Sequence, residues 1–363
     1  MADDSALMRQ TLKRILAASA DLELVGFARD GEDAVSKARE LRPDVVSMDI
    51  NMPKLDGVTA LQIILQEKIC PVVMVSSLTQ KGATTTFECL ELGAFDFVGK
   101  PDGTVSNNMG LIADELISKL KAAASRGIVD RLQRGREHRR TYVPPMGATF
   151  ENVNRKRAVA IGISTGGPAT LQEVLPQIPA DAPASFFLVQ HMPPSFIASF
   201  AKRLGDNCAL KVVEGRSGMP VEPSVCYVAP GGMHLCLHRK MTGEVVIRTP
   251  STPATLFVPS VGVMMASVLN IYGSDTIGVL MTGIGDDGAD EMVRIRQAGG
   301  VTIAESEESC VVYGMPYQAF ARGGAEIVLP SWEIADRLVR ILGAKTEADP
   351  PSSRKSALQE ARS

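Results

Sequence analysis

The sequence predicts an α/β protein with two domains, each built around a parallel sheet. Two stretches of the chain alternate short β-rich runs with runs whose apolar residues recur three and four positions apart, which is typical of βα units on a parallel sheet. The length of 363 residues fits two or three domains of about 150 residues each. We expect domains at 1–118 and 156–345, a basic linker at 119–155, and a charged, proline-containing tail at 346–363 that should be disordered.

The individual elements follow from their periodicity. In the first domain, strands are predicted at 22–28, 44–50, 71–77 and 94–100, and helices at 31–41, 57–67 and 84–92. In the second domain, strands are predicted at 157–164, 185–192, 224–232, 243–249, 276–283, 300–306 and 325–330, with helices between several of them. Both patterns favour doubly wound sheets that carry helices on both faces.

Composition argues against several classes of function. The 38 basic and 41 acidic residues give a net charge of −3, so we expect no nucleic-acid partner. No run reaches about 18 apolar residues and the start of the chain is acidic, so we expect a cytoplasmic protein without membrane insertion. The six cysteines contain no C-x-x-C pair, which predicts buried thiols. The basic residues between Lys121 and Arg157 are interpreted as linker, with an RNA or membrane contact as the alternative.

Acidic and polar residues stand at the predicted strand ends of the first domain. Asp49 ends an apolar strand, and ligands bind at this carboxyl edge in open α/β folds. Asp3 and Asp4 precede a helical pattern, while Ser76 and Lys100 each end another strand. Three carboxylates favour a hard cation such as Mg²⁺, which together with Lys100 would neutralise a phosphoryl group on Asp49. Each aspartate taken alone could instead be a helix cap or a turn residue.

These positions resemble the response-regulator receiver domain over about residues 1–118. The resemblance rests on the acid pair near the start and on the motifs SMDINMPKLDG, MVSS and GKP. It implies a flavodoxin-like doubly wound sheet and makes Asp49 the phosphorylated residue. For receiver phosphorylation it implies Mg²⁺ bound by Asp3, Asp4, Asp49 and the Asn51 carbonyl, and a switch pair formed by Ser76 and Lys100.

The start of the chain departs from the receiver pattern. The family begins with an apolar strand that leads into the acid pair and lies centrally in the sheet, whereas only Met1 and Ala2 precede Asp3 here. Without that first strand, backbone groups would stay unpaired and the core would open. Two interpretations stay open, a start site assigned too far downstream or an impaired receiver, and we favour the first.

A glycine turn opens the second domain. The segment RAVAIGISTGGPATLQEVL is predicted to run from a strand through a tight turn into a helix that begins near Pro168. This places Ser164 at the hinge, where the amides of Thr165 to Gly167 could donate hydrogen bonds to a developing oxyanion. Dinucleotide binding is the competing interpretation, but G-I-S-T-G-G is not G-x-G-x-x-G and no acidic residue follows at the expected distance.

A histidine and two aspartates follow two other strands of the second domain. His191 ends the run SFFLVQHM, and Asp286 and Asp287 lie in a glycine loop after TIGVLMTG. A serine hydroxyl needs a base to become a nucleophile, and a neutral imidazole needs an orienting carboxylate. Alone, the histidine would more often be structural and the aspartates would be helix caps. The chain order Ser, His, Asp matches none of the three familiar hydrolase orders.

The second domain closely resembles the catalytic domain of the CheB family, the chemotaxis protein-glutamate methylesterases. GISTGGP, QHMPPSF, YVAPGGMHL, TGIGDDGA and SCVVYGMP match its motifs in order. The resemblance makes Ser164 the nucleophile, His191 the general base and Asp287 the residue that orients His191. It gives Asp286 no catalytic role. The implied oxyanion donors are the backbone amides of Thr165 and Ile284, the latter standing where the family usually has methionine.

The resemblance to both domains implies a phosphorylation-regulated serine hydrolase. It would demethylate glutamate methyl esters, and deamidate glutamines, on methyl-accepting chemotaxis receptors, with no cofactor for the esterase. The receiver is expected to cover the active-site edge until a histidine kinase phosphorylates Asp49. We expect a monomer. Two alternatives stay open: a phospho-dependent adaptor without esterase activity, and the same chemistry in another chemosensory-like pathway.

A zinc site is a weaker alternative for a group of residues in the second domain. The group consists of Cys226, His234, Cys236 and His238. Their spacing matches no usual zinc motif. His234, in the glycine-rich APGGMH stretch, is instead expected to line the substrate cleft.

Overall fold

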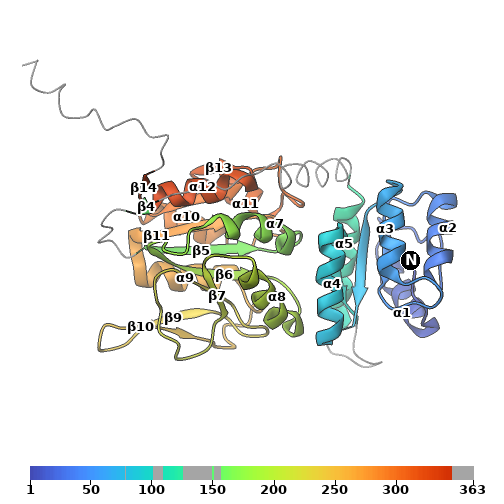
Figure 1. Ribbon diagram of the computed structural model, residues 1–363, viewed down its shortest axis with the longest axis horizontal. Helices are drawn as coiled ribbons and strands as arrows, with labels where there is room; N and C mark the ends of the chain where they lie inside the picture. The colour runs from blue at the N-terminus through green and yellow to red at the C-terminus, as the bar shows by residue number, and fades with distance from the viewer. Residues whose placement is uncertain (78, 101–108, 126–148, 151–156, 346–363) are drawn as a thin grey trace, which may run out of the picture.

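Seven parallel strands form the central sheet of the larger domain, in the order β13-β12-β11-β5-β6-β8-β7. Their bounds are Arg157–Ile163 (β5), Ala184–Gln190 (β6), Lys211–Glu214 (β7), Val225–Val228 (β8), Thr276–Leu280 (β11), Val301–Glu305 (β12) and Ile327–Leu329 (β13). This computed structural model describes residues 1–77, 79–100, 109–125, 149–150 and 157–345 (Figure 1). The strands are nearly continuous apolar runs because both faces of a parallel sheet are covered by helices.

Helices cover both faces of this sheet. Gly167–Val174 (α7), Pro194–Asp206 (α8) and Ser331–Ile341 (α12) bury their apolar side chains against one face. Val261–Tyr272 (α9), Ala289–Gln297 (α10) and Met315–Ala321 (α11) cover the other face. Short elements complete the domain: 3-10 helices Leu175–Gln177 (η1) and Gly273–Asp275 (η2), a hairpin of Cys236–Arg239 (β9) with Val245–Arg248 (β10), and Thr149–Phe150 (β4) paired with Ala344–Lys345 (β14).

The order of the strands creates a switch point between β5 and β11. From β5 the chain moves outward through β6 to the edge strand β7 and then fills the place between them with β8. It later returns to β11 on the other side of β5 before continuing to β12 and β13. The loops after β5 and β11 therefore leave in opposite directions. A crevice opens at the carboxyl ends of the strands at such a point, and ligands of open α/β sheets bind there.

The smaller, N-terminal domain contains a parallel sheet in the order β1-β2-β3. Its strands are Val46–Asp49 (β1), Val72–Ser76 (β2) and Asp96–Gly99 (β3), and its helices are Ala6–Ala17 (α1), Gly31–Leu41 (α2), Gly57–Gln66 (α3), Gln80–Leu92 (α4) and Met109–Ala123 (α5). Four of the helices begin at a side chain that accepts a backbone N–H in the first turn. These N-caps are Ser5, Asp30, Asp56 and Thr79, and they explain why the helices start at these residues.

The strand predicted at 22–28 is wrong. Residues 22–27 have no strand assignment, and Ala28 forms only an isolated bridge to Ala2. Ala2 also forms a parallel bridge with Met48 of β1. The first residues of the chain therefore lie between the segment at 22–28 and β1. A strand needs a neighbour along its whole length to pair its backbone groups. Among the described residues, the segment at 22–28 meets residues 1–3 through backbone hydrogen bonds only at Gly26 and Ala28, so it does not join the sheet as a strand.

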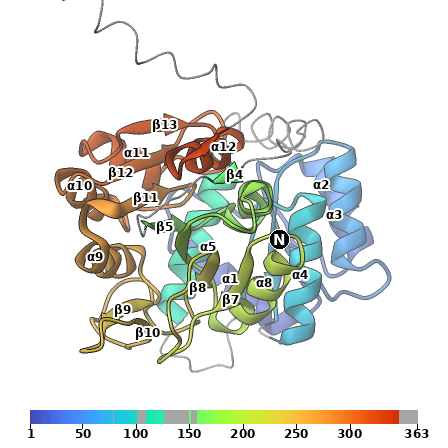
Figure 2. The same ribbon diagram turned by 60° about the vertical axis from the view of Figure 1, so that its left-hand side comes forward.

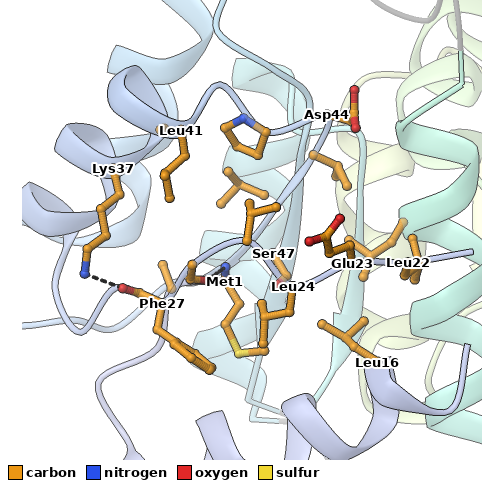
Figure 3. A pocket seen from close by; sticks show the side chains of 18 of the residues that line it. Met1, Leu16, Leu22, Glu23, Leu24, Phe27, Lys37, Leu41, Asp44 and Ser47 are labelled. Atoms are coloured by element: carbon orange, nitrogen blue, oxygen red, sulfur yellow. Dashed lines mark hydrogen bonds between the residues drawn. The ribbon is translucent and has the colours of Figure 1, made fainter. Parts of the chain in front are cut away.

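A cavity of about 330 Å³ lies in the small domain where this pairing is missing (Figure 3). Met1, Leu24, Phe27, Leu41 and Ser47 are among its lining residues. The ammonium group of Met1 donates a hydrogen bond to the Gly26 carbonyl at 2.9 Å. Burial lowers the pKa of this ammonium to about 6, so folding disfavours its charged form.

Extending the chain ahead of Met1 by Val-Ile-Val-Ile is expected to raise the unfolding temperature of the small domain by several degrees. The added strand would fill the cavity and replace a buried ammonium with an amide, and about 1 kcal/mol shifts the melting temperature of a small domain by about 4–8 °C. The measurement is a thermal unfolding scan, with a Gly-Ser-Gly-Ser extension of equal length as the control. Equal melting temperatures for the two extensions would contradict this account of the cavity.

The small domain packs against the larger domain through α4, β3 and α5. Figures 1 and 2 place α4 beside α8. Phe97 of β3 lies against Phe196 of α8, with ring centroids 4.6 Å apart. Phe87 of α4 packs edge-on against the same Phe196 ring, with ring centroids 6.2 Å apart. At the edge of this contact, Arg203 donates a hydrogen bond to Glu91 at 2.9 Å. The two apolar cores are thereby continuous.

Most predicted elements are confirmed, and the corrections are local. The helix predicted at 31–41 has the bounds of α2. The strands β7 and β9 were not predicted, and both are short and only partly buried. Residues 126–148 and 151–156 of the predicted linker, and the tail at 346–363, lie outside the described residues, so the domain boundaries stay a prediction. Among the described helices, none is both long and apolar enough to cross a membrane.

Candidate active site

Three adjacent strands of the larger sheet carry the predicted catalytic residues at their carboxyl ends. Ser164 follows β5, His191 follows β6, and Asp287 lies in the loop after β11. The register pairs Ile163 with Gln190, so the residues that follow them, Ser164 and His191, leave the sheet side by side. Backbone bonds fix both turns: the Ser164 amide donates to the Thr282 carbonyl at 2.9 Å and the His191 amide to the Ile163 carbonyl at 3.1 Å.

His191 and Asp287 form a direct pair. The Nε2 atom of His191 lies 2.9 Å from Oδ2 of Asp287, and both side chains are largely buried. Because the carboxylate accepts the Nε2–H, the lone pair of the neutral ring is on Nδ1. Nδ1 is buried and has no hydrogen-bond partner among the described residues, and no hydrogen bond joins it to Ser164. Such contacts are often open in resting structures and close when substrate binds.

The N-terminus of α9 holds the Asp287 carboxylate in place. Oδ1 accepts hydrogen bonds from Ser260 Oγ and the Gly262 amide, both at 2.9 Å, and Oδ2 accepts one from the Val261 amide at 2.7 Å. Burial alone would raise the pKa of Asp287, but the hydrogen bonds from His191 and these amides outweigh it, so the pKa lies below its usual value. Asp287 is therefore an anion beside the imidazole across the neutral pH range.

An aromatic ring and an amide fix the surroundings of His191. Phe257 stacks on the imidazole with ring centroids 4.2 Å apart and an interplanar angle of 13°. Gln190 is buried, and its side-chain amide donates to the carbonyl of Ser164 at 2.8 Å and to that of His191 at 2.9 Å. The stacked Phe257 ring restricts the plane of the imidazole, and Gln190 fixes the backbone from which the imidazole extends toward Asp287.

The turn after β5 presents free backbone donors. Gly166 has a φ of 79°, a left-handed conformation that favours glycine, and α7 begins directly after it with Pro168 in its first turn. Within the described part of the chain, the amides of Thr165 and Ile284 donate no hydrogen bond. Thr165 follows Ser164 in the chain. Ile284 lies near Ser164 in space, because the backbone of the preceding residue, Gly283, closely approaches the Ser164 side chain. The amides of Thr165 and Ile284 are therefore suited to stabilise an oxyanion.

Thr282 connects three loops behind Ser164 through hydrogen bonds. Its hydroxyl donates to the Thr165 carbonyl at 2.9 Å and accepts from the Val312 amide at 2.9 Å. Its own amide donates to the carboxyl of Glu305 at 2.8 Å. Burial raises the pKa of Glu305 to about 7 despite these bonds. Thr282 thus links Ser164, the end of β12 and the segment that follows it.

The second candidate site lies at the carboxyl edge of the small sheet. Lys100 Nζ is 2.8 Å from Asp49 Oδ2 and 3.0 Å from Asp3 Oδ2, and both aspartates are buried. Burial raises the pKa of Asp49 above its usual value, and the hydrogen bond from Lys100 offsets only part of that rise. Carboxylate oxygens of Asp3, Asp4 and Asp49 lie within 4.8 Å of one another, so these residues fit a hard divalent cation.

The remaining predicted residues of this site differ in exposure. Asn51 and Asp4 are exposed at its rim. Ser76 is fully buried and its hydroxyl accepts a hydrogen bond from Thr86 at 2.7 Å. Among the described residues, only Asp3, Asp4 and Asp49 form a cluster of acidic, histidine or cysteine side chains that could hold a metal, so the zinc alternative has no support there. The expectation that His234 lines a cleft is wrong, because it is fully buried.

Four residues that shape this candidate site were not predicted from the sequence. They are Gln190, Phe257, Ser260 and Thr282. Gln190 and Thr282 stand within matched motifs, next to residues that were singled out, and that adjacency is their only sequence signal. Phe257 and Ser260 come from the segment before α9, which carries no pattern that would place it over a histidine from β6.

Comparisons with known proteins agree with this geometry. Residues 159–338 match the family model for the CheB methylesterase, and residues 1–105 match the response regulator receiver domain. A protein-glutamate methylesterase/protein-glutamine glutaminase of Syntrophomonas wolfei is 58% identical over 344 residues, covering 94% of this chain and 98% of the relative. The corresponding protein of Archaeoglobus fulgidus is 42% identical over 94% of this chain and 97% of its own length. The crystal structure of the Thermotoga maritima CheB methylesterase catalytic domain is 38% identical and matches with a TM-score of 0.50, covering 52% of this chain and all of that one.

Proposed function

The chain belongs to the CheB methylesterase family, with a receiver domain ahead of the catalytic domain, and from this premise we propose which residues carry its reaction and how they are regulated. It is a protein-glutamate methylesterase and protein-glutamine glutaminase under control of phosphorylation. The observation that carries the assignment is the His191–Asp287 pair, 2.9 Å apart, at strand ends beside Ser164. The substrates are glutamate methyl esters and glutamines of methyl-accepting chemotaxis receptors.

Ester hydrolysis proceeds through an acyl-enzyme. Ser164 Oγ attacks the ester carbonyl carbon while Nδ1 of His191 takes the hydroxyl proton, and Asp287 stabilises the imidazolium through Nε2–H. The amides of Thr165 and Ile284 stabilise the oxyanion. The tetrahedral intermediate then collapses, the C–O bond breaks, and methanol leaves with the proton from His191. Water attacks the acyl-enzyme with the same base and releases glutamate, and a glutamine substrate follows the same path with ammonia as leaving group.

The receiver supplies the control. A histidine kinase is the phosphoryl donor and Asp49 the acceptor, with Lys100 positioned to pair with the incoming phosphoryl oxygens. Asp3, Asp4, Asp49 and the Asn51 carbonyl would hold Mg²⁺. When bound, this ion neutralises charge on the phosphoryl group during transfer. Phosphorylation of Asp49 would recruit Lys100 away from Asp3, and Ser76 would have to exchange its hydrogen bond with Thr86.

The contact between the domains is the closed state of this control. Phe97 and Phe87 pack on Phe196, which lies on the helix that directly follows His191. Val311 belongs to an apolar cluster with Leu116 and Leu120 of α5, and its side chain also contacts the backbone at Gly166 in the nucleophile turn. The receiver therefore covers the site from the side of Ser164 in the resting protein. We expect this regulation to operate in a cytoplasmic monomer.

Labelling with an organophosphonate that reacts with activated serine hydroxyls tests the assignment. The reagent should modify Ser164, as shown by mass spectrometry of the digested protein, and His191→Gln should abolish the modification because the base is gone. Ser274→Ala, which changes an exposed serine ahead of β11, is the matched control and should label normally. Failure of the intact protein to label, with and without phosphodonor, would favour the adaptor without esterase activity.

A small-molecule phosphodonor with Mg²⁺ is expected to raise methanol release by roughly tenfold, within the usual range of 5–150-fold for coupled sites. Asp49→Asn removes the acceptor and should abolish the increase while leaving basal release unchanged. Asp44→Asn, at an exposed position ahead of β1, is the control and should respond like the natural chain. If Asp49→Asn still responds to the phosphodonor, Asp49 is not the switch.

A further inference from the structure

His234 is not one of the proposed catalytic residues, but both of its ring nitrogens and its backbone amide form hydrogen bonds. It is fully buried. Its Nδ1 faces the Ser260 amide at 3.1 Å and its Nε2 faces the Pro253 carbonyl at 2.9 Å, while its own amide donates to the Pro250 carbonyl at 2.8 Å. An amide can only donate and a carbonyl can only accept. These two partners therefore fix one neutral tautomer, with the proton on Nε2 and the lone pair on Nδ1.

The three contacts hold both ends of the segment 250–260. That segment supplies two parts of the catalytic site. Phe257 stacks on the His191 imidazole, and Ser260 both caps α9 and donates to Asp287. His234 is therefore connected to the catalytic pair through two residues: Phe257 contacts the ring of His191, and Ser260 contacts the carboxylate of Asp287.

We propose that His234 is a positioning residue of the esterase, which fixes Ser260 and Phe257 so that Asp287 and His191 keep their catalytic alignment. The proposal rests on the function proposed above. The bond to Ser260 is the decisive one, since the Ser260 amide precedes the two α9 amides that bind Asp287. Losing the acceptor at Nδ1 would leave a buried N–H without a partner at the start of α9 and let that end of the helix shift.

Two isosteric substitutions separate the two ring contacts. In His234→Asn the side-chain oxygen takes the place of Nδ1 and can accept from Ser260. In His234→Gln the side-chain nitrogen takes the place of Nε2 and can donate to Pro253, but Ser260 loses its acceptor. His238→Gln, on the exposed side of β9, is the matched control for the same change of residue type.

The experiment measures methanol release by the full chain in the presence of phosphodonor and methylated receptor membranes. We expect His234→Asn to keep kcat within about threefold and His234→Gln to lower it by about 10–100-fold, the range for mutations that misplace a reacting group without removing it. The KM for receptor should stay unchanged in both. His238→Gln should leave both constants unchanged.

A spectroscopic readout separates positioning from a general loss of stability. The chain contains only 4 histidines, so ¹⁵N-histidine labelling resolves the Nε2–H of His191 in its bond to Asp287. This signal should shift in His234→Gln and persist in His234→Asn. Equal activity of the two variants, or a loss of activity that follows the melting temperature while the His191 signal stays in place, would overturn the proposal. Absence of Ser164-dependent methanol release from the natural chain would instead refute the proposed function, whereas the histidine spectra would still report on His234.

Discussion

Replacing Ser164 with alanine is expected to lower kcat for methanol release by at least about 10³-fold. The variant lacks the hydroxyl that attacks the ester, so the acyl-enzyme cannot form, and what is left is the small rate supported by binding and the oxyanion donors. Ser164 is a small, largely buried side chain in a turn held by backbone bonds to Thr282 and Gly167. Its loss should therefore leave the fold intact.

The measurement is initial-rate methanol release from methylated receptor membranes, with circular dichroism to verify folding. Ser274→Ala serves as control and should match the natural chain. Release that persists in Ser164→Ala at more than about one tenth of the normal rate would rule out Ser164 as the nucleophile. A fall of only a few fold in both serine variants would indicate a nonspecific effect of the substitutions.

Replacing Asp287 with asparagine is expected to lower kcat by about 10³–10⁴-fold. The carboxylate accepts from His191, Ser260 and two helix amides, whereas a carboxamide has one acceptor oxygen and brings an N–H₂ group that would face donors. The amide would favour the tautomer with the proton on Nδ1, which cannot act as base toward Ser164. Asp286→Asn is the matched control, because Asp286 is exposed and its side chain pairs with Arg322 at the surface; such pairs contribute about 0–1 kcal/mol.

The pH dependence of unfolding gives an independent test of Asp287. Its pKa is lowered from 3.8 in the folded protein, so the stability it contributes is present at neutral pH and is lost as the pH falls below that unfolded value. The free energy of unfolding should therefore differ between the natural chain and Asp287→Asn at pH 7, and the difference should shrink toward pH 3. A difference that grows as the pH falls would contradict the direction of the pKa shift.

The sequence predicted where the candidate catalytic groups lie in the fold because strand ends and glycine turns leave clear local patterns. Ser164, His191 and Asp287 each follow a continuous apolar run, and the parallel sheet brings such ends to one edge. Asp49 and Lys100 were predictable for the same reason. Asp49 ends β1 and Lys100 follows β3, the two strands that flank β2, and the long Lys100 side chain reaches across that edge to form an ion pair with Asp49 at 2.8 Å.

The contacts that tune these groups were beyond sequence reasoning. Thr282 and Gln190 act through backbone carbonyls and amides of other loops, and such partners leave no trace in residue spacing. Phe87, Phe97 and Phe196 read as ordinary core residues, although they join the two domains. The strand expected at 22–28 failed because a strand depends on its neighbour for hydrogen bonds, and periodicity describes only the segment itself.

The packing of the receiver suggests how phosphorylation reaches the esterase. Val311 contacts the receiver helix α5 on one side and the nucleophile turn at Gly166 on the other. The next residue, Val312, donates its amide to Thr282, which in turn accepts the Ser164 amide. Separation of the domains would thus expose the substrate edge and also release a constraint on the turn that carries Ser164.

The central claim is that phosphorylation of the receiver opens a Ser164-dependent esterase. The most direct test is methanol release from methylated receptor membranes by the intact chain and by Ser164→Ala, each with and without phosphodonor and Mg²⁺. We predict slow release by the natural chain, a rise of roughly tenfold with phosphodonor, and no release above background from Ser164→Ala under either condition. Release that is equal in the two proteins, or that the phosphodonor leaves unchanged, would contradict the claim.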